Sequence, residues 1–226
     1  LSEEVTNTLL ENPDMVKLGG EKRRVTIMMS DLRGFTALAD RLEPEQVVQI
    51  LNAYFEVMVD VLLKYNATIN EIIGDALLVI FGAPQAMPDR AGRAIACSIE
   101  MQNAMTKVNE QNRSHGLPEI EMGIGLNDVE VIVGNIGSSK RSKYGVVGSG
   151  VNMTSRIESY SVGGQILISD SVKKEAGDTL RIDEQRDVTP KGSEASIRIY
   201  EVGGISGKYN LALEKKDIDL VELVQA

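Results

Sequence analysis

Residues 24–34 read RVTIMMSDLRG, and this stretch decides the fold of the 226-residue chain. Its first seven residues are β-prone, and the following Asp31 to Gly34 are typical of a turn. The pattern predicts a strand that ends at Asp31, which is a favourable place for chemistry. Residues 44–62 then repeat apolar side chains at three- and four-residue spacing, which predicts an amphipathic helix with Pro44 in its first turn.

A β-hairpin is predicted after this helix. The runs 67–73 and 77–81 are strand-like, and the turn Gly74-Asp75-Ala76 between them carries a second Asp. Further helices are expected at 89–112, at 151–159 and from about 170, and further strands at 120–126, 129–136, 144–147, 165–168, 180–188 and 196–202. Antiparallel pairs mixed with crossover helices predict an α+β fold, in which helices cover an antiparallel-rich mixed sheet. The expected order is a βαββαβ core followed by a C-terminal αβαββ extension.

Composition narrows the possible functions. Asp and Glu outnumber Lys and Arg by 33 to 24, and no basic stripe is present, so nucleic-acid binding is not expected. One Cys and one His exclude a disulfide scaffold and a Cys/His zinc cluster, so any metal must be held by oxygen ligands. Apolar runs are shorter than the roughly 18 residues of a membrane span, and the start at Leu1 lacks a signal-peptide pattern. We expect a reducing, cytoplasmic fragment of a longer chain.

Asp31 and Asp75 are the first candidate site residues. If their strands are neighbours, both carboxylates lie at one edge of the sheet. Two hard carboxylates suit Mg²⁺ or Mn²⁺, and such a pair is typical of two-metal phosphoryl or nucleotidyl transfer. The alternative is that both residues only stabilise turns, which is a common role of Asp.

Three blocks in order decide between these readings. They are SDLRGFT at 30–36, IGDALLVIFG at 73–82 and VGSGVNMTSRIE at 147–158, and they resemble the class III nucleotide cyclase catalytic domain, with the bacterial, cyanobacterial-type guanylyl cyclases closest. The resemblance covers about residues 17–202. With the weaker patterns at both ends, it implies a linker at 1–20 from an upstream regulatory domain, a catalytic domain at 21–203 and a tail at 204–226.

The resemblance implies two Mg²⁺ or Mn²⁺ ions at each active site. They would be held by Asp31 and Asp75, with the Leu32 carbonyl as an additional ligand. The implied phosphate cradle is the run of backbone amides of Arg33, Gly34, Phe35 and Thr36, where consecutive N–H groups converge at a turn.

The third block implies two further catalytic residues. Asn152 would hold the ribose, and Arg156 would meet the charge on the α-phosphate; their spacing of four places them on one helical face. Without the resemblance, Arg156 would be read as a surface arginine. In the family the two halves of each site come from different domains, so an identical chain implies a head-to-tail homodimer with an inactive monomer.

The purine is chosen in this family at two positions, which are Glu71 and Gly145 here. Period-two alternation would place Glu71 between Ile69 and Ile73 on one apolar strand face, where a buried carboxylate needs a partner. Guanine offers two adjacent donors, N1–H and N2–H₂, whereas adenine presents an acceptor at N1. GTP is therefore the expected substrate. The alternative is a solvated Glu71 and a turn glycine at Gly145.

Two positions depart from the family pattern. Relatives usually carry Thr/Ser-Gly-Glu where this chain has Asp128-Val129-Glu130, so an altered hairpin is expected there. Relatives also often read Lys-Gly-Lys where this chain has Lys191-Gly192-Ser193, so the contact to the terminal phosphate is lost, made by Lys191 or supplied elsewhere. The sequence thus predicts a homodimeric guanylyl cyclase. The alternatives are an adenylyl or dual-specificity cyclase, a catalytically impaired nucleotide-binding dimerisation module and, with less support, a two-metal phosphatase.

Overall fold

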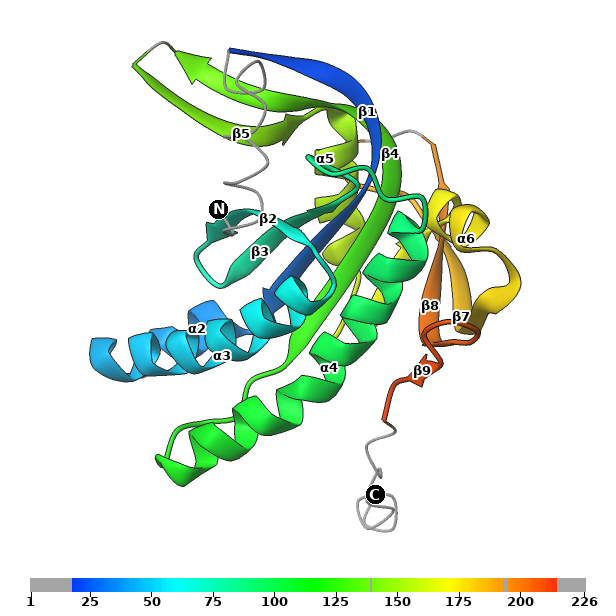
Figure 1. Ribbon diagram of the computed structural model, residues 1–226. Coiled ribbons are helices and arrows are strands. Elements are labelled where there is room, and N and C mark those ends of the chain that lie inside the picture. The colour runs from blue at the N-terminus through cyan, green and yellow to red at the C-terminus, as the bar shows by residue number, and fades with distance from the viewer. Residues whose placement is uncertain (1–17, 139, 193–194, 215–226) are drawn as a thin grey trace.

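The computed structural model describes residues 18–138, 140–192 and 195–214, and nine strands within these ranges form one sheet (Figure 1). The strand order is β2-β3-β1-β4-β6-β8-β7, with β5 beside β4 and β9 beside β8. Among these nine described strands, β4 and β6 form the one parallel pair, and the other pairs are antiparallel. The strands are β1 (Gly19–Leu32), β2 (Thr68–Ile73), β3 (Ala76–Phe81), β4 (Met122–Ser138), β5 (Arg141–Val147), β6 (Ile166–Ser169), β7 (Leu180–Val188), β8 (Ile197–Ile205) and β9 (Leu211–Ala212).

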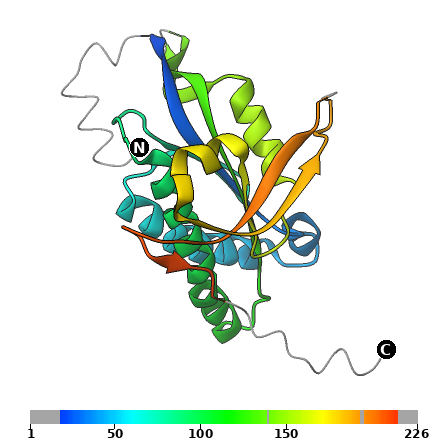
Figure 2. The same ribbon diagram turned by 90° about the vertical axis from the view of Figure 1, so that its right-hand side faces the viewer.

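Helices cover both faces of this sheet, as the two views in Figures 1 and 2 show. The helices are α2 (Phe35–Ala39), α3 (Pro44–Lys64), α4 (Arg90–Ser114), α5 (Ser149–Glu158), α6 (Asp170–Ala176) and the short 3₁₀ turn η2 (Gly177–Thr179). Met28 and Leu32 of β1 pack on the side of α3, α4 and α6, while Val25 and Ile27 pack on the opposite side. Residues 25–28 of β1 are buried on both faces of the sheet, and three of these four residues are apolar. The predicted α+β architecture is confirmed.

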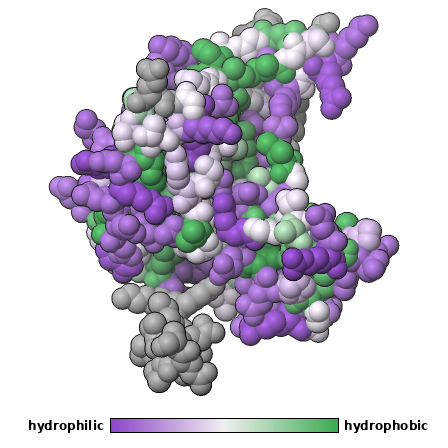
Figure 3. Space-filling view, turned by 180° about the vertical axis from the view of Figure 1, so that it is seen from behind, coloured by the Kyte–Doolittle hydropathy of each residue, from purple (hydrophilic) through white to green (hydrophobic). Residues whose placement is uncertain are grey.

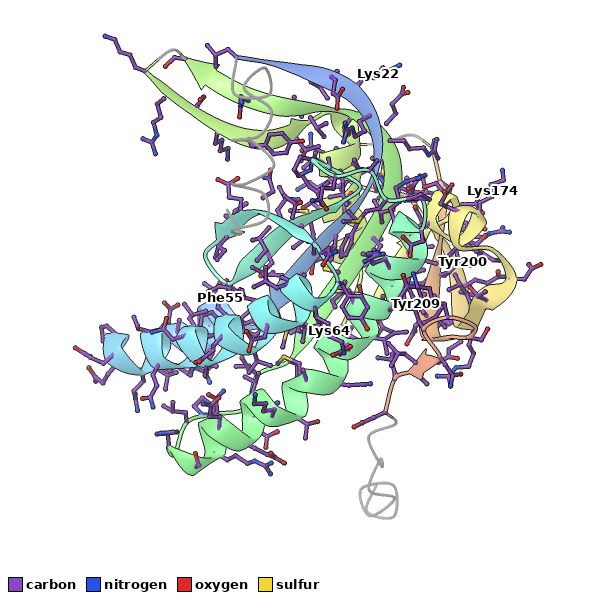
Figure 4. All side chains as sticks on the ribbon, viewed as in Figure 1. Lys22, Phe55, Lys64, Lys174, Tyr200 and Tyr209 are labelled. Atoms are coloured by element: carbon purple, nitrogen blue, oxygen red, sulfur yellow. The ribbon has the colours of Figure 1, made fainter. Side chains whose placement is uncertain are left out.

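Helix α3 begins where the sequence predicts, at Pro44. Glu43 and Gln46 form a capping box that satisfies amides at its N-terminus. It is long and apolar enough to cross a membrane by length and composition, but one of its faces, which includes Tyr54 and Met58, is buried in the core. In its last turn, Lys64 Nζ lies 2.7 Å from Glu100 Oε1 of α4, and this ion pair joins the two helices. Figure 4 labels Lys64, with Tyr209 nearby in the view.

The predicted break between strands 120–126 and 129–136 is wrong, because β4 runs through it without interruption. Asp128 looks like a turn residue, but its buried carboxylate accepts hydrogen bonds from Arg24 Nε (2.6 Å), Arg90 Nε (2.8 Å) and Thr26 Oγ1 (2.9 Å). Val129 pairs with Val25 of β1 instead of standing in a hairpin turn. The departure at Asp128-Val129 therefore changes packing inside a strand and leaves no altered turn.

The sheet also extends beyond the predicted domain end at residue 203. Strand β9 pairs with the end of β8, with Gly204 opposite Ala212 and Ile205 opposite Leu211. Residues 204–214 are thus part of the fold instead of a tail. Residues 1–17 of the predicted linker, residues 215–226 of the predicted tail and Ser193 lie outside the described residues.

Candidate active site

Asp31 and Asp75 come together at one edge of the sheet, as predicted. Strand β1 pairs with β3 so that Ser30 lies opposite Leu77, which brings the end of β1 beside the β2–β3 turn. The Leu32 amide donates a hydrogen bond to Asp75 Oδ2 at 3.3 Å. Asp31 is half-buried, and this burial together with the hydrogen bond and charge of Asp75 raises its pKa to about 6.

This pair fits divalent cations. Two carboxylates that share a proton at one site repel each other once both are ionised, and a hard cation removes that repulsion. Within the described residues, no group of three or more His, Cys, Asp or Glu side chains could enclose a metal by itself. The donor set therefore suits Mg²⁺ or Mn²⁺ ions whose remaining positions are filled by water and substrate phosphates.

The raised pKa of Asp31 predicts how the metal-free protein responds to pH. Between its usual value of 3.8 and about 6, Asp31 holds a proton in the folded state that the unfolded chain has released. The free energy of unfolding must then fall as the pH rises through this window. We expect Asp31→Asn in a chelator to raise the melting temperature above that of the wild type at pH 7.5, with the difference vanishing at pH 4.

Asp60→Asn is the matched control for this melting experiment, because Asp60 is an exposed carboxylate on α3. It should change neither melting temperature nor its pH dependence. Adding Mn²⁺ at pH 7.5 should stabilise the wild type more than Asp31→Asn, because only the wild type keeps both carboxylates. An equal gain for both proteins, or a stabilisation by Asp31→Asn that persists at pH 4, would contradict this account of the pair.

The turn after β1 offers backbone amides, but not all of those predicted. The Arg33 amide already donates to the Glu121 carbonyl at 2.7 Å, and the Arg33 guanidinium pairs with Glu158. Gly34 has a φ of 67°, and no described atom lies within 4 Å of where its Cβ would be. The first hydrogen bond of α2 is donated by Leu38 to the Gly34 carbonyl, so the N–H groups of residues 34–36 have no acceptor within the helix. The Arg33 amide is therefore not free to bind phosphate as predicted, whereas in the described part of the chain the amides of Gly34, Phe35 and Thr36 are.

Asn152 and Arg156 lie on the outward face of α5. The opposite face of this helix, which includes Thr154 and Ile157, is buried against the sheet. Within the described ranges, neither the Asn152 nor the Arg156 side chain makes a hydrogen bond or an ion pair with the rest of the chain. The predicted common face is confirmed, and α5 presents both groups away from its own core.

The loop after β7 lies beside this helix. Tyr160, just beyond α5, donates from its hydroxyl to the Thr189 carbonyl at 2.9 Å, and the Cβ position of Gly192 is 3.8 Å from Arg156 Nη2. Lys191 is exposed next to this contact. The structure thus brings the Lys191 loop to Arg156, on the α5 side of the molecule.

Glu71 differs from its prediction. A β-bulge between Ile69 and Glu71 breaks the expected alternation along β2. The Glu71 side chain is 42% exposed, and its Oε1 lies 2.8 Å from Lys143 Nζ on β5. The prediction of a buried Glu71 on an apolar strand face is therefore wrong. Gly145, two residues after Lys143, lies beside Asn70, so the two positions that the sequence predicts to choose the base lie close together.

Sequence reasoning missed Lys143 and Asn70 as neighbours of this pair. Lys143 belongs to a short basic run that is typical of a solvated turn, and nothing local distinguished it. Asn70 directly precedes Glu71, and strict alternation would have put it on the other face of β2.

The described hydrogen bonds and ion pairs do not connect the carboxylate pair with Asn152 or Arg156. One cavity of about 530 Å³ lies elsewhere, between α4, the start of β4 and β8, and none of the candidate residues lines it. Seen from behind, the surface is hollowed between the β4–β5 arm and the end formed by α2 and α3, with hydrophobic surface along the hollow (Figure 3). Exposed apolar side chains on β2 and on this arm are Ile72, Ile73, Ile132, Ile136 and Val147.

Known proteins resemble the chain over this whole region. The family model described as adenylate and guanylate cyclase catalytic domain matches residues 20–203. The crystal structure of the guanylyl cyclase Cya2 is 51% identical, with a TM-score of 0.85, and the match covers 87% of this chain and 100% of that chain. The adenylyl cyclase CyaB from P. aeruginosa is 33% identical, with a TM-score of 0.77 and coverage of 86% and 100%.

A curated relative is much longer than this chain. Adenylate cyclase 1 of Rhizobium meliloti (strain 1021) is 29% identical over 186 residues. The match covers 81% of this chain but only 28% of the relative. The chain therefore spans less than a third of the length of that protein.

Proposed function

Because the chain belongs to the family of adenylate and guanylate cyclase catalytic domains, we propose that it is a guanylyl cyclase, which converts GTP into 3′,5′-cyclic GMP and pyrophosphate. Membership makes it a nucleotide cyclase, and class III cyclases typically dimerise and use two divalent metal ions. The choice of GTP, the roles of individual residues and the homodimer are the parts we propose.

The arrangement of two incomplete half-sites carries this proposal. Asp31 and Asp75 face each other at one edge of the sheet, whereas Asn152 and Arg156 point outward from α5 without partners in the described residues. A second copy in head-to-tail arrangement supplies the missing half to each site. The apolar side chains exposed on β2 and on the β4–β5 arm support such a contact between copies.

The proposed mechanism divides the work among the chain's own groups. Asp31 and Asp75 bind the cations, with the Leu32 carbonyl as a further ligand, and the amides of residues 34–36 orient the terminal phosphates. When bound, the two ions activate the attacking ribose 3′-oxygen and neutralise charge on the leaving pyrophosphate. Asn152 orients the ribose so that its 3′-oxygen lies in line with the α-phosphorus.

Arg156 supplies positive charge that the bound ions do not fully provide at the α-phosphate. Two divalent ions contribute +4, the triphosphate about −4 and two carboxylates −2, which leaves about −2 at the reacting centre. An outward arginine from the other protomer offsets part of this charge as it develops on the α-phosphate. Lys191, exposed beside Arg156, is the proposed contact to the terminal phosphate.

Glu71 supports guanine as the base. Its two carboxylate oxygens match the N1–H and N2–H₂ donors of guanine and would repel N1 of adenine. In the described structure Lys143 forms an ion pair with this carboxylate. Both side chains are about half exposed, and such exposed pairs contribute only about 0.2–1 kcal/mol to stability. Guanine can therefore take the place of Lys143 at little cost.

A product assay tests the proposed function directly. The protein is incubated with GTP or ATP and Mg²⁺ or Mn²⁺ over a range of protein concentrations. We expect cyclic GMP from GTP, with a specific activity that falls on dilution as the dimer dissociates. Cyclic AMP as the main product would replace guanylyl with adenylyl cyclase, and no pyrophosphate release from either nucleotide would favour a binding module.

An adenylyl or dual-specificity cyclase is the second candidate, and Lys143 is the observation that favours it. Its ammonium group lies beside the base-choosing carboxylate and can donate to N1 of adenine. The assay with both nucleotides separates the two candidates.

A further inference from the structure

The β-bulge in β2 changes which side chains face the base-choosing positions. In a regular strand Asn70 and Glu71 would point to opposite faces of the sheet. The register shift between Ile69 and Glu71 removes this alternation at Asn70. Bulges of this kind re-aim side chains and are frequent beside active sites.

Asn70 lies directly against Gly145. A Cβ on Gly145 would be 3.2 Å from Asn70 Oδ1, so the carboxamide occupies space that a larger residue at this position would take. Asn70 Oδ1 is buried from solvent and has no hydrogen-bond partner among the described residues. Leaving such a polar atom unsatisfied costs about 1–3 kcal/mol. With no donor to Oδ1 in this orientation, the carboxamide can turn its NH₂ group to this side without losing a hydrogen bond made by the described residues.

We propose that Asn70 is a third base-reading residue, whose carboxamide takes the place of the side chain that Gly145 lacks. This inference rests on the nucleotide-binding site proposed above. Guanine that gives its N1–H and N2–H₂ to Glu71 still needs a donor for O6. The Asn70 carboxamide has a donor edge and an acceptor edge, which exchange by rotation of its terminal torsion. Asn70 donates to O6 of guanine.

Asn70→Asp tests this role with almost no change in shape. The variant loses the donor for O6 of guanine but keeps acceptors for the 6-amino group of adenine. We expect the ratio of kcat/KM for GTP to that for ATP to fall about 10- to 100-fold. Because both nucleotides are assayed on one preparation, this ratio does not depend on the fraction of folded protein. Asn66→Asp, an exposed position just before β2, is the matched control and should leave the ratio unchanged.

A double-mutant cycle tests the contact with Gly145. Gly145→Ala places a methyl group against Asn70 and should displace its carboxamide, lowering the ratio about 3- to 10-fold. In an Asn70→Ala background the carboxamide is gone, so the same glycine substitution should have no further effect. Additive effects of the two substitutions would overturn the proposed contact.

The outcomes separate this inference from the proposed function. An unchanged ratio in Asn70→Asp, or equal losses with both nucleotides, overturns the role of Asn70 while a wild type that makes cyclic GMP keeps the proposed function. If the wild type prefers ATP, the choice of GTP fails, yet Asn70→Asp must still shift the ratio further toward ATP. If neither nucleotide is turned over, displacement of a fluorescent guanosine nucleotide by GTP and by ATP supplies the same ratio from binding.

Discussion

Replacing Arg156 by Ala is expected to lower kcat for cyclisation about 10²- to 10³-fold. The outward guanidinium has no described partner in its own chain, so its removal should leave the fold intact. The loss should appear in kcat more than in KM, because the charge that Arg156 is proposed to meet develops in the transition state. Initial rates of cyclic GMP formation over a range of GTP concentrations measure both. Arg41→Ala, an exposed arginine after α2, is the matched control and should retain full activity.

Mixing two inactive variants tests where Arg156 acts. Asp31→Asn removes a proposed metal ligand from one half-site, and Arg156→Ala removes the proposed catalytic arginine from the other. If each site takes one half from each protomer, an equal mixture that exchanges subunits contains half heterodimers, each with one intact site. The mixture should recover about a quarter of wild-type activity. No recovery after subunit exchange is confirmed would contradict sites shared between two chains.

Replacing Glu71 by Lys is expected to reverse the preferred nucleotide. The carboxylate proposed to accept two guanine donors becomes an ammonium that can donate to N1 of adenine, and the existing Lys143 loses its partner. Sites built on paired polar groups discriminate by up to about 10⁴, so the preference for GTP over ATP should fall by as much as that factor. The measurement is kcat/KM for both nucleotides.

Glu56→Lys is the matched control for this charge reversal, because Glu56 is exposed on α3. It should leave the preference unchanged. A Glu71→Lys enzyme that still prefers GTP to the wild-type extent would remove Glu71 from base recognition and leave the choice of base to Asn70 and Lys143.

The carboxylate pair could be predicted from the sequence because its geometry is nearly local. A strand that ends at Asp31 and a hairpin whose turn holds Asp75 meet wherever their strands are neighbours. The shared face of Asn152 and Arg156 on α5 could be predicted equally well, since a spacing of four residues places two side chains together on any helix.

Asp128 shows where local patterns fail. Two polar residues between apolar runs are typical of a turn, yet here the carboxylate is buried inside β4. Its partners include Arg24 and Arg90, which are 104 and 38 residues away in the chain. Only the folded structure brings these donors together, and with them Asp128 can be buried in a continuous strand.

By itself, the sequence determined which chemical groups this protein carries: two carboxylates proposed to bind metal, an Asn/Arg pair on one helical face and a carboxylate proposed to read guanine. The tertiary structure alone decided how several of them are presented. The bulge turns Asn70 toward Gly145, Lys143 reaches Glu71 from β5, and Arg33 gives its amide to Glu121. The physical reason is that side-chain periodicity is a local property of the backbone, whereas strand register, bulges and contacts between distant strands depend on the packing of the whole sheet.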